Sequence, residues 1–404
     1  MIINKTIGSM LIIAGTTIGA GMLALPIASS GLGFSTAMVI LFVAWCLMTY
    51  TALLTLELHQ YAPANATLNT LAKNILGQKG QIIANFSMIF LFYALCAAYI
   101  AGGGGQLQLM LSEWSSSKLP PQVGAVTFSL IFGSIIILGA GTVDKINQVL
   151  FMVKIIVLTT IFSMLTPHVQ GAHLLNMPLE QGLIISAIPV IITSFGFHGS
   201  IPSIVKYMGG NVKSLRKVMI IGASMPLVIY LIWQVVSQGV ISQQSLYASE
   251  GLDGFIVSLS SLLQNDAIAN TLTIFANLAL ATSFLGVSLG LFDFFSDVLN
   301  KTDSTKDRLL TALVTFMPPL GFALFYPQGF IMALGYAAIA LVILAIFLPV
   351  IMVWKQRAMV SIASDKPNYQ VRGGKGALVT VALFGVFIIS AQFLQIFGVV
   401  PTIH

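Results

Sequence analysis

The sequence predicts an all-α integral membrane protein with eleven transmembrane helices, ten of which form two inverted five-helix repeats. The first observation is composition: 57% of the 404 residues are hydrophobic and only 7% are charged. Soluble domains carry about 25% charged residues, so this chain lacks the polar side chains needed to cover a water-exposed surface. The second observation is the number of long apolar stretches, and the third is that two of them are interrupted at corresponding positions.

A transmembrane helix needs about 20 apolar residues. This length places eleven spans near residues 6–30, 34–59, 81–111, 121–141, 146–166, 182–208, 217–240, 267–297, 308–325, 329–353 and 377–399. The first five spans (6–166) and the next five (182–353) correspond in position, and because five is odd the two units must be inverted relative to each other. The last span, 377–399, is an extra helix, and residues 1–404 form a single transmembrane domain.

The positive charges indicate the orientation. The formal net charge is +6, and with a cytoplasmic N-terminus nearly all Lys and Arg residues fall in cytoplasmic loops. The exceptions are Lys118 outside and Lys154 within the fifth span. This asymmetry predicts a cytoplasmic N-terminus and a periplasmic C-terminus. The basic residues are scattered over short loops without interleaved aromatics, so we expect no nucleic-acid partner. Cys46 and Cys96 lie mid-span and are expected to be unreactive buried thiols.

The first span contains an unusual stretch at residues 14–26. It holds Gly15, Gly19 and Gly21, two threonines and a closing proline, and each glycine costs about 1 kcal/mol relative to alanine inside a helix. Local unwinding is therefore expected, and in a bilayer it is tolerated only where the freed backbone groups are buried in protein or line a polar cavity. The sixth span repeats this feature at residues 188–202. Paired interrupted helices in inverted halves are typical of the substrate site of a transporter.

Four segments resemble motifs of the bacterial hydroxy and aromatic amino acid permeases: residues 14–26, 194–205, 281–293 and 325–327. The resemblance covers nearly the whole chain and is greatest to the tyrosine-specific members, with the tryptophan permeases as the near alternative. It implies the leucine-transporter-like five-plus-five fold of the amino acid–polyamine–organocation superfamily. It also implies import of L-tyrosine across the bacterial inner membrane by proton symport, with a tryptophan or general aromatic amino acid permease as the alternative.

The break in the first span is expected to bind substrate chiefly through its backbone. Helix N-terminal ends attract a carboxylate and unwound carbonyls suit an ammonium group, which are the two charges of an amino acid zwitterion. This role falls to Gly15, Thr16, Gly19, Ala20 and Gly21. The alternative is close helix packing, because Gly15 and Gly19 have the four-residue spacing of a packing motif.

The sixth span supplies the counterpart, Ser194, Phe195, Gly196, Phe197 and His198. The two phenylalanines are expected either to stack on an aromatic substrate or to serve ordinary packing. His198 lies well inside its span, and intramembrane ionisable groups are functional hypotheses by default. It is expected either to contact substrate or titrate with transport, or to hold loose backbone as a neutral side chain.

Two further positions are candidates for the substrate's ring. Tyr93 and Tyr99 in the third span are six residues apart and do not share a helical face, so at most one lines the site, and Tyr93 is the candidate. Asn277 in the eighth span is expected either to meet a ring hydroxyl or to make an interhelical hydrogen bond.

Lys154 is the most informative charge because it lies about 12 Å inside the fifth span. Its side chain either extends back to the membrane surface or remains buried as a proton-exchanging group. The resemblance implies the second role, since some proton-coupled members of the superfamily place a lysine where sodium-coupled relatives bind an ion. Its expected neighbours are Thr282 and Ser283, with carbonyls of span one.

Other function classes fit less well. A channel favours repeated filter segments and a sensor a sizeable soluble domain, and the sequence has neither. No Ser-His-Asp, His-Glu-x-x-His or nucleotide-binding pattern is present, so we expect neither an enzyme nor an ATP-driven pump. No cofactor or metal is expected. The expected partners are L-tyrosine, the proton and membrane lipid, and the sequence does not indicate the oligomeric state.

Overall fold

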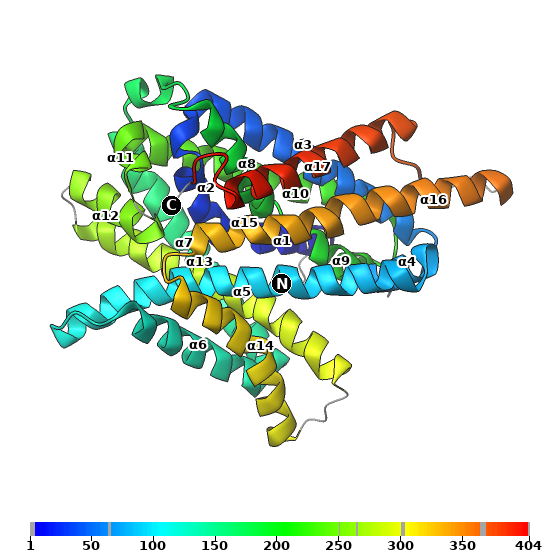
Figure 1. Cartoon of the computed structure of the whole chain (residues 1–404), viewed down its shortest axis with the longest axis horizontal. Coiled ribbons are helices and arrows are strands. Elements are labelled where there is room, and N and C mark those ends of the chain that lie inside the picture. The colour runs from blue at the N-terminus through cyan, green and yellow to red at the C-terminus, as the bar shows by residue number, and fades with distance from the viewer. Residues whose placement is uncertain are drawn as a thin grey trace.

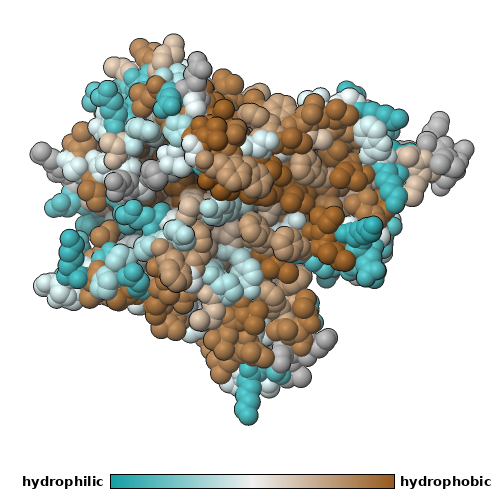
Figure 2. Space-filling view, in the orientation of Figure 1, coloured by the Kyte–Doolittle hydropathy of each residue, from teal (hydrophilic) through white to brown (hydrophobic). Residues whose placement is uncertain are grey.

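The computed structural model describes residues 5–63, 66–249, 251–263, 266–299, 304–363 and 369–402. Every regular element in these ranges is helical, and most of the long helices run roughly parallel (Figure 1). Hydrophobic residues cover the middle of the molecule along the helices, and hydrophilic residues gather toward both ends (Figure 2). This distribution is the one that a bilayer requires, and the prediction of an all-α membrane protein is confirmed.

Ten helical segments in the described ranges are long and apolar enough to cross a bilayer, and one bent pair brings the number to eleven. The spans are α1 (Lys5–Thr17) with α2 (Ala20–Ala28), α3 (Phe34–His59), α5 (Gln78–Ser115), α6 (Pro121–Leu138), α7 (Ala140–Leu165), α8 (Gln181–Ser194) with α9 (Ile201–Met208), α10 (Val212–Val240), α13 (Asp266–Val298), α14 (Thr305–Phe325), α15 (Phe330–Val342) with α16 (Leu348–Ala363), and α17 (Gly374–Ile396). A π-helical turn, η5 (Ile343–Phe347), joins α15 to α16. Shorter helices are α4 (Leu68–Leu76), α11 (Gln243–Tyr247) and α12 (Gly251–Leu263).

The two interruptions lie where the sequence predicts them. The first helix stops at Thr17 and resumes at Ala20 with a 50° bend. The sixth helix stops at Ser194 and passes through a 3₁₀ turn, η4 (His198–Ser200), before α9 begins. Helix α2 packs on α8, so the second half of the first interrupted helix is a neighbour of the first half of the sixth.

Side chains from other helices satisfy carbonyls that prolines leave free. A proline lacks an N–H, so the carbonyl four residues earlier loses its helical partner. Pro26 frees the carbonyl of Met22, and the indole N–H of Trp233 donates to that oxygen at 3.0 Å. Pro318 frees the carbonyl of Val314 in α14, and the hydroxyl of Tyr93 donates to it at 2.7 Å. In a bilayer these bonds replace the water that a soluble protein would use.

An ion pair fixes the C-terminal end of α3. Arg357 of α16 donates to both carboxylate oxygens of Glu57, each at 2.7 Å, and the backbone N–H of Val371 donates to the same carboxylate at 2.7 Å. The Glu57 side chain is only 3% exposed. A carboxylate with this many donors is well compensated for burial, so the pair connects α3, α16 and the segment before α17.

Candidate functional site

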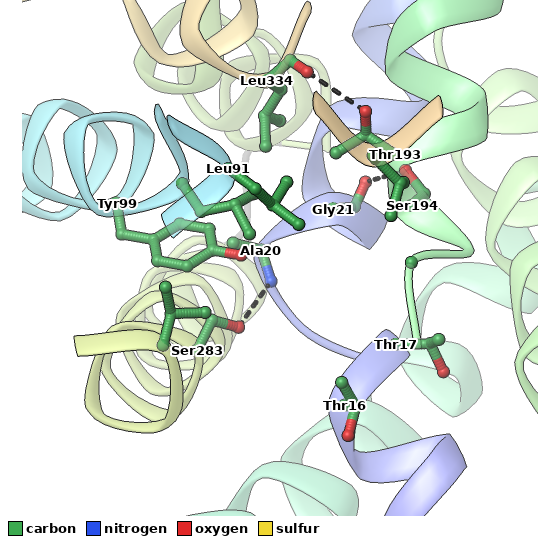
Figure 3. A pocket seen from close by; sticks show the side chains of 14 residues that line it. Thr16, Thr17, Ala20, Gly21, Leu91, Tyr99, Thr193, Ser194, Ser283 and Leu334 are labelled. Atoms are coloured by element: carbon green, nitrogen blue, oxygen red, sulfur yellow. Dashed lines mark hydrogen bonds between the residues drawn. The ribbon is translucent and has the colours of Figure 1, made fainter. Parts of the chain in front are cut away.

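The break in the first helix is held by side chains from two other helices. The ammonium nitrogen of Lys154 donates to the carbonyl of Ile18 at 2.7 Å. The hydroxyl of Ser283 accepts from the N–H of Ala20 at 3.1 Å (Figure 3). Lys154 belongs to α7 and Ser283 to α13. The unwound backbone therefore contacts α7 and α13 directly, which satisfies groups that would otherwise be costly to bury.

The two breaks are also bonded to each other. The Ser194 hydroxyl at the end of α8 donates to the carbonyl of Gly21 at 2.9 Å (Figure 3). On the other side of the breaks, the hydroxyls of Thr16 and Ser200 are 3.1 Å apart. Both contacts join the first interrupted helix to the sixth, so the two breaks form one structural unit.

Close approach explains two of the glycines. A methyl group at Gly19 would overlap the hydroxyl of Ser283, and one at Gly21 would lie 3.0 Å from the backbone Cα of Ser194. Backbone atoms cannot rotate away as a side chain can, so Gly21 is required for the contact between α2 and α8. The glycine-rich sequence thus serves close packing at the break as well as its unwinding.

A small cavity of about 60 Å³ lies between the breaks, with room for roughly four water-sized groups. Its wall has a polar part from the first and sixth interrupted helices and α13, and an apolar part from α5, α13 and α15 (Figure 3). The polar part comprises Thr16, Thr17, Ala20, Gly21, Thr193, Ser194, Gly196 and Ser283; the apolar part comprises Leu91, Leu95, Val287, Leu334 and Leu341, with Tyr99 beside them. A molecule with a charged head and an apolar tail suits such a division.

Helix ends give the polar wall its electrostatic character. The N-terminal end of α2, at Ala20 and Gly21, presents backbone N–H groups with partial positive charge. The C-terminal ends of α1 and α8, at Thr17 and Ser194, present carbonyl groups with partial negative charge. All four residues line the cavity, so opposite partial charges face the same small volume.

Lys154 is almost completely buried, at 1% exposure, and does not extend to the membrane surface. Besides the carbonyl of Ile18, its ammonium donates to the hydroxyl of Thr282 at 3.0 Å and lies 5.0 Å from the centre of the Phe151 ring. These partners are one carbonyl, one hydroxyl and one aromatic face. No carboxylate is among the hydrogen-bond and ring-contact partners that the structure resolves for Lys154. Removing or neutralising this charge changes the bonding of the break itself.

The structure brings six of the predicted site residues into the cavity wall: Thr16, Ala20, Gly21, Ser194, Gly196 and Ser283. Gly19 lies against Ser283 just behind the wall, and Thr282 reaches Lys154 instead of the cavity. Gly15 packs on the ring of Phe151, outside the cavity wall.

Besides Gly15, Gly19, Lys154 and Thr282, five more predicted residues lie outside the wall: Tyr93, Phe195, Phe197, His198 and Asn277. Tyr93 serves α14, as described above. Asn277 donates to the Thr273 carbonyl in its own helix and to the sulfur of Met110, which is an interhelical contact. The rings of Phe195 and Phe197 are buried in protein contacts at 1% exposure.

His198 ties the sixth helix to α3. Its Nε2 lies 2.9 Å from the hydroxyl of Thr51, and its ring is 5.1 Å from the ring of Phe197. Nδ1 is buried without a hydrogen-bond partner. The His198 side chain therefore holds the segment after the break against a neighbouring helix, and its role in transport stays a prediction.

The apolar wall contains residues that the sequence did not single out. Leu91, Leu95 and Tyr99 come from one face of α5, and Leu334 and Leu341 come from α15. Leucines in a membrane helix carry no pattern that separates a cavity wall from a lipid contact. Tyr99 is buried at 7% exposure. The sequence shows only that Tyr93 and Tyr99 lie on different faces of the helix, and it does not show which face meets the cavity.

Within the described ranges, no group of three or more His, Cys, Asp and Glu side chains could hold a metal ion.

Comparison with known proteins gives the chain its family. Residues 2–392 match the tryptophan/tyrosine permease family. The tyrosine-specific transport system 1 of Haemophilus influenzae is 43% identical over 98% of this chain and 99% of its own length. The tyrosine-specific transport system 2 of the same organism is 38% identical over the full length of both chains. The tryptophan-specific transport protein of that organism is 34% identical over 96% of this chain and 95% of its own length. Since these matches run from end to end, this chain is a multi-pass membrane permease of the tryptophan/tyrosine permease family.

Proposed function

We propose that this protein imports L-tyrosine across the bacterial cytoplasmic membrane by proton symport. The observation that carries the proposal is the cavity between the two interrupted helices, in which helix ends of opposite partial charge face an apolar wall. The two relatives of greatest identity described above are named as tyrosine-specific transport systems, which supports tyrosine as the substrate.

The zwitterionic head of the substrate fits the polar wall. Its carboxylate binds the N–H of Gly21 and replaces the Ser283 hydroxyl as the acceptor of the Ala20 N–H, where the α2 dipole is positive. Its ammonium group binds the carbonyls of Thr17 and Ser194, at the negative ends of α1 and α8. The aromatic ring extends toward the leucines of α5 and α15, where removal from water contributes about 25 cal/mol for each Å² of apolar surface. The 60 Å³ cavity must widen to admit the ring, which requires movement of one wall.

Lys154 provides the coupling to protons. Its ammonium joins the carbonyl of Ile18, in the break, to the hydroxyl of Thr282 on α13. Ser283 adds a second link from α13 to Ala20. A change in the protonation of Lys154 alters the contact between the break and these two helices, so proton binding is linked to the geometry of the substrate site.

Transport proceeds by alternating access around this site. The two inverted five-helix repeats supply one interrupted helix each, and one helix bundle rocks against the other to open the site to either side. The N-terminus is cytoplasmic and the C-terminus periplasmic, following the positive-inside rule.

Tryptophan or another aromatic amino acid is the alternative substrate, because a relative 34% identical to this chain is named as tryptophan-specific. The apolar wall accepts any large ring, and the hydroxyl of tyrosine is the distinguishing group. Rejection of a ring that lacks this hydroxyl requires a buried polar partner that would be left unpaired.

The test is uptake of radiolabelled tyrosine into proteoliposomes that contain the purified protein. An inward proton gradient should drive accumulation, a sodium gradient alone should not, and excess unlabelled tyrosine should compete better than tryptophan or phenylalanine. Accumulation that follows sodium would overturn the proton assignment, and stronger competition by tryptophan would overturn the substrate assignment. Binding without uptake would indicate a sensor in place of a transporter.

A further inference from the structure

Tyr230 of α10 lies between the two helix breaks. Its hydroxyl oxygen is 2.6 Å from the carbonyl oxygen of Thr17 and 2.7 Å from that of Ser194. The side chain is 0% exposed and is not among the residues that line the cavity. It reaches the cavity through Thr17 and Ser194, both of which line it.

The two carbonyls are special because each belongs to the last residue of a helix. Thr17 ends α1 and Ser194 ends α8, and the C-terminal end of a helix carries a partial negative charge. Without a shared donor, two such ends would repel each other in a site of low dielectric. The phenolic hydroxyl is the group that brings both oxygens to within hydrogen-bond distance of one point.

A phenol has only one hydrogen to donate. The hydroxyl of Tyr230 therefore donates fully to one carbonyl at a time or divides its hydrogen between the two. The carbonyl of Thr17 also accepts from the N–H of Gly19 at 2.9 Å. A carbonyl oxygen has two lone pairs, so the Ser194 carbonyl is the member of this pair that keeps acceptor capacity for a donor that enters the cavity. An ammonium group has three N–H donors and suits a pair of oxygens held close together.

The ring of Tyr230 is held firmly. Its edge packs against the ring of Phe195 at a centroid distance of 5.1 Å and an interplanar angle of 70°, a favourable arrangement for two aromatic rings. The hydroxyls of Thr17 and Ser194 donate elsewhere, to Ile13 in the same helix and to Gly21 respectively. The spacing of the two carbonyls therefore depends on the position of the tyrosine hydroxyl.

We propose that Tyr230 is a positioning residue that sets the spacing of the Thr17 and Ser194 carbonyls, and thereby the binding of the substrate's ammonium group. This inference rests on the proposed function, because it takes an amino acid as the substrate. It also gives Phe195 a role as the support for the Tyr230 ring.

The test compares three ligands on the variant Tyr230→Phe in proteoliposomes. The ligands are L-tyrosine, 3-(4-hydroxyphenyl)propionate, which lacks the ammonium group, and tyramine, which lacks the carboxylate. The KM for tyrosine and the inhibition constant of tyramine should rise about tenfold, which corresponds to about 1.4 kcal/mol. The inhibition constant of the propionate should stay within twofold, because its carboxylate contacts are at Ala20 and Gly21.

The matched control is Tyr50→Phe, which removes a tyrosine hydroxyl that donates to the backbone carbonyl of Arg372, away from both breaks. It should leave all three constants unchanged. Equal weakening of all three ligands by Tyr230→Phe, or no weakening of any, would overturn the inference. A merely structural role predicts equal weakening, so the comparison separates it from positioning.

Two further measurements complete the test. Should Tyr230→Phe fail to give folded protein, the variant Phe195→Leu removes the edge contact and keeps the hydroxyl. Phe195→Leu should weaken the binding of tyrosine and tyramine but not of the propionate, by less than Tyr230→Phe does. An equal effect on the three ligands would overturn the inference. Failure of the unmodified protein to take up any aromatic amino acid would overturn the proposed function, and this is measured before any variant is made.

Discussion

Replacing Lys154 with alanine removes the one ammonium group at the helix break whose contacts the structure resolves. The carbonyl of Ile18 then loses its donor, while the hydroxyl of Thr282 still donates to the Leu278 carbonyl in its own helix. A buried acceptor left unpaired costs about 1–3 kcal/mol, so we expect the protein to fold with a modest loss of stability. The larger effect is expected on coupling, because Lys154 is the group that we propose to carry the proton.

The size of that effect follows from the driving force. One proton that moves inward across 100 mV supplies about 2.3 kcal/mol, and each 1.4 kcal/mol corresponds to a tenfold ratio. Tyrosine is a zwitterion without net charge, so symport with one proton supports an accumulation of about 40-fold at this voltage. In Lys154→Ala the accumulation should fall to the equilibrium ratio of one, while exchange of labelled for unlabelled tyrosine should continue, because the backbone groups of the site remain.

The assay measures uptake and exchange in proteoliposomes with an imposed potential and pH gradient. The control is Lys145→Ala, which removes an exposed lysine from the same helix and should accumulate tyrosine as the unmodified protein does. Full proton-driven accumulation by Lys154→Ala would refute the coupling role. If Lys154→Ala lost both exchange and accumulation, the division between coupling and substrate binding would be refuted.

Two other predictions concern the packing around the site. Gly21→Ala places a methyl group 3.0 Å from the backbone of Ser194; this overpacking should cost about 1–3 kcal/mol and abolish uptake. Gly286→Ala adds a methyl group with no atom within 4 Å and should leave uptake and thermal stability unchanged or slightly improved. At Asp253 of α12, burial raises the pKa of the carboxyl and a hydrogen bond from Gln106 opposes the shift, so the folded state holds this proton more tightly than the unfolded state. The stability that the protonated carboxyl contributes is present at acidic pH and is lost as the pH rises through the folded-state pKa. Asp253→Asn should therefore raise the midpoint of thermal unfolding more at neutral pH than at acidic pH. A larger increase at acidic pH would contradict this reasoning.

The fold was predictable because a bilayer restricts the choice of structures. A spanning segment must satisfy its own backbone, so length and apolar composition were enough to locate the spans. The second span, expected at 34–59, matches α3 at Phe34–His59. The interrupted segments were also predictable, because glycines and prolines within an apolar run oppose a continuous helix at known cost.

The side chains that complete the site were less predictable. The contacts of Lys154 with the first span and with Thr282 match the expectation, because few partners for a buried ammonium exist at that depth. Tyr99 and the leucines of α5 and α15 line the cavity without any distinguishing sequence pattern. Tyr93 and Tyr99 differ only in which face of α5 they occupy, and that depends on how α5 is rotated against its neighbours.

Bonds to the first break divide into two groups, and this division constrains how the site can move. Tyr230 and Ser194 connect the break to α10 and α8, whereas Lys154 and Ser283 connect it to α7 and α13. In the alternating-access motion proposed above, the two interrupted helices move together, which preserves the first group of bonds and exchanges the second. The first group consists of neutral hydroxyls bonded to carbonyls, which no proton gradient alters. The second contains Lys154, the only basic side chain among the four, so a change in its protonation can act on the second group of contacts while leaving the substrate's binding groups in place.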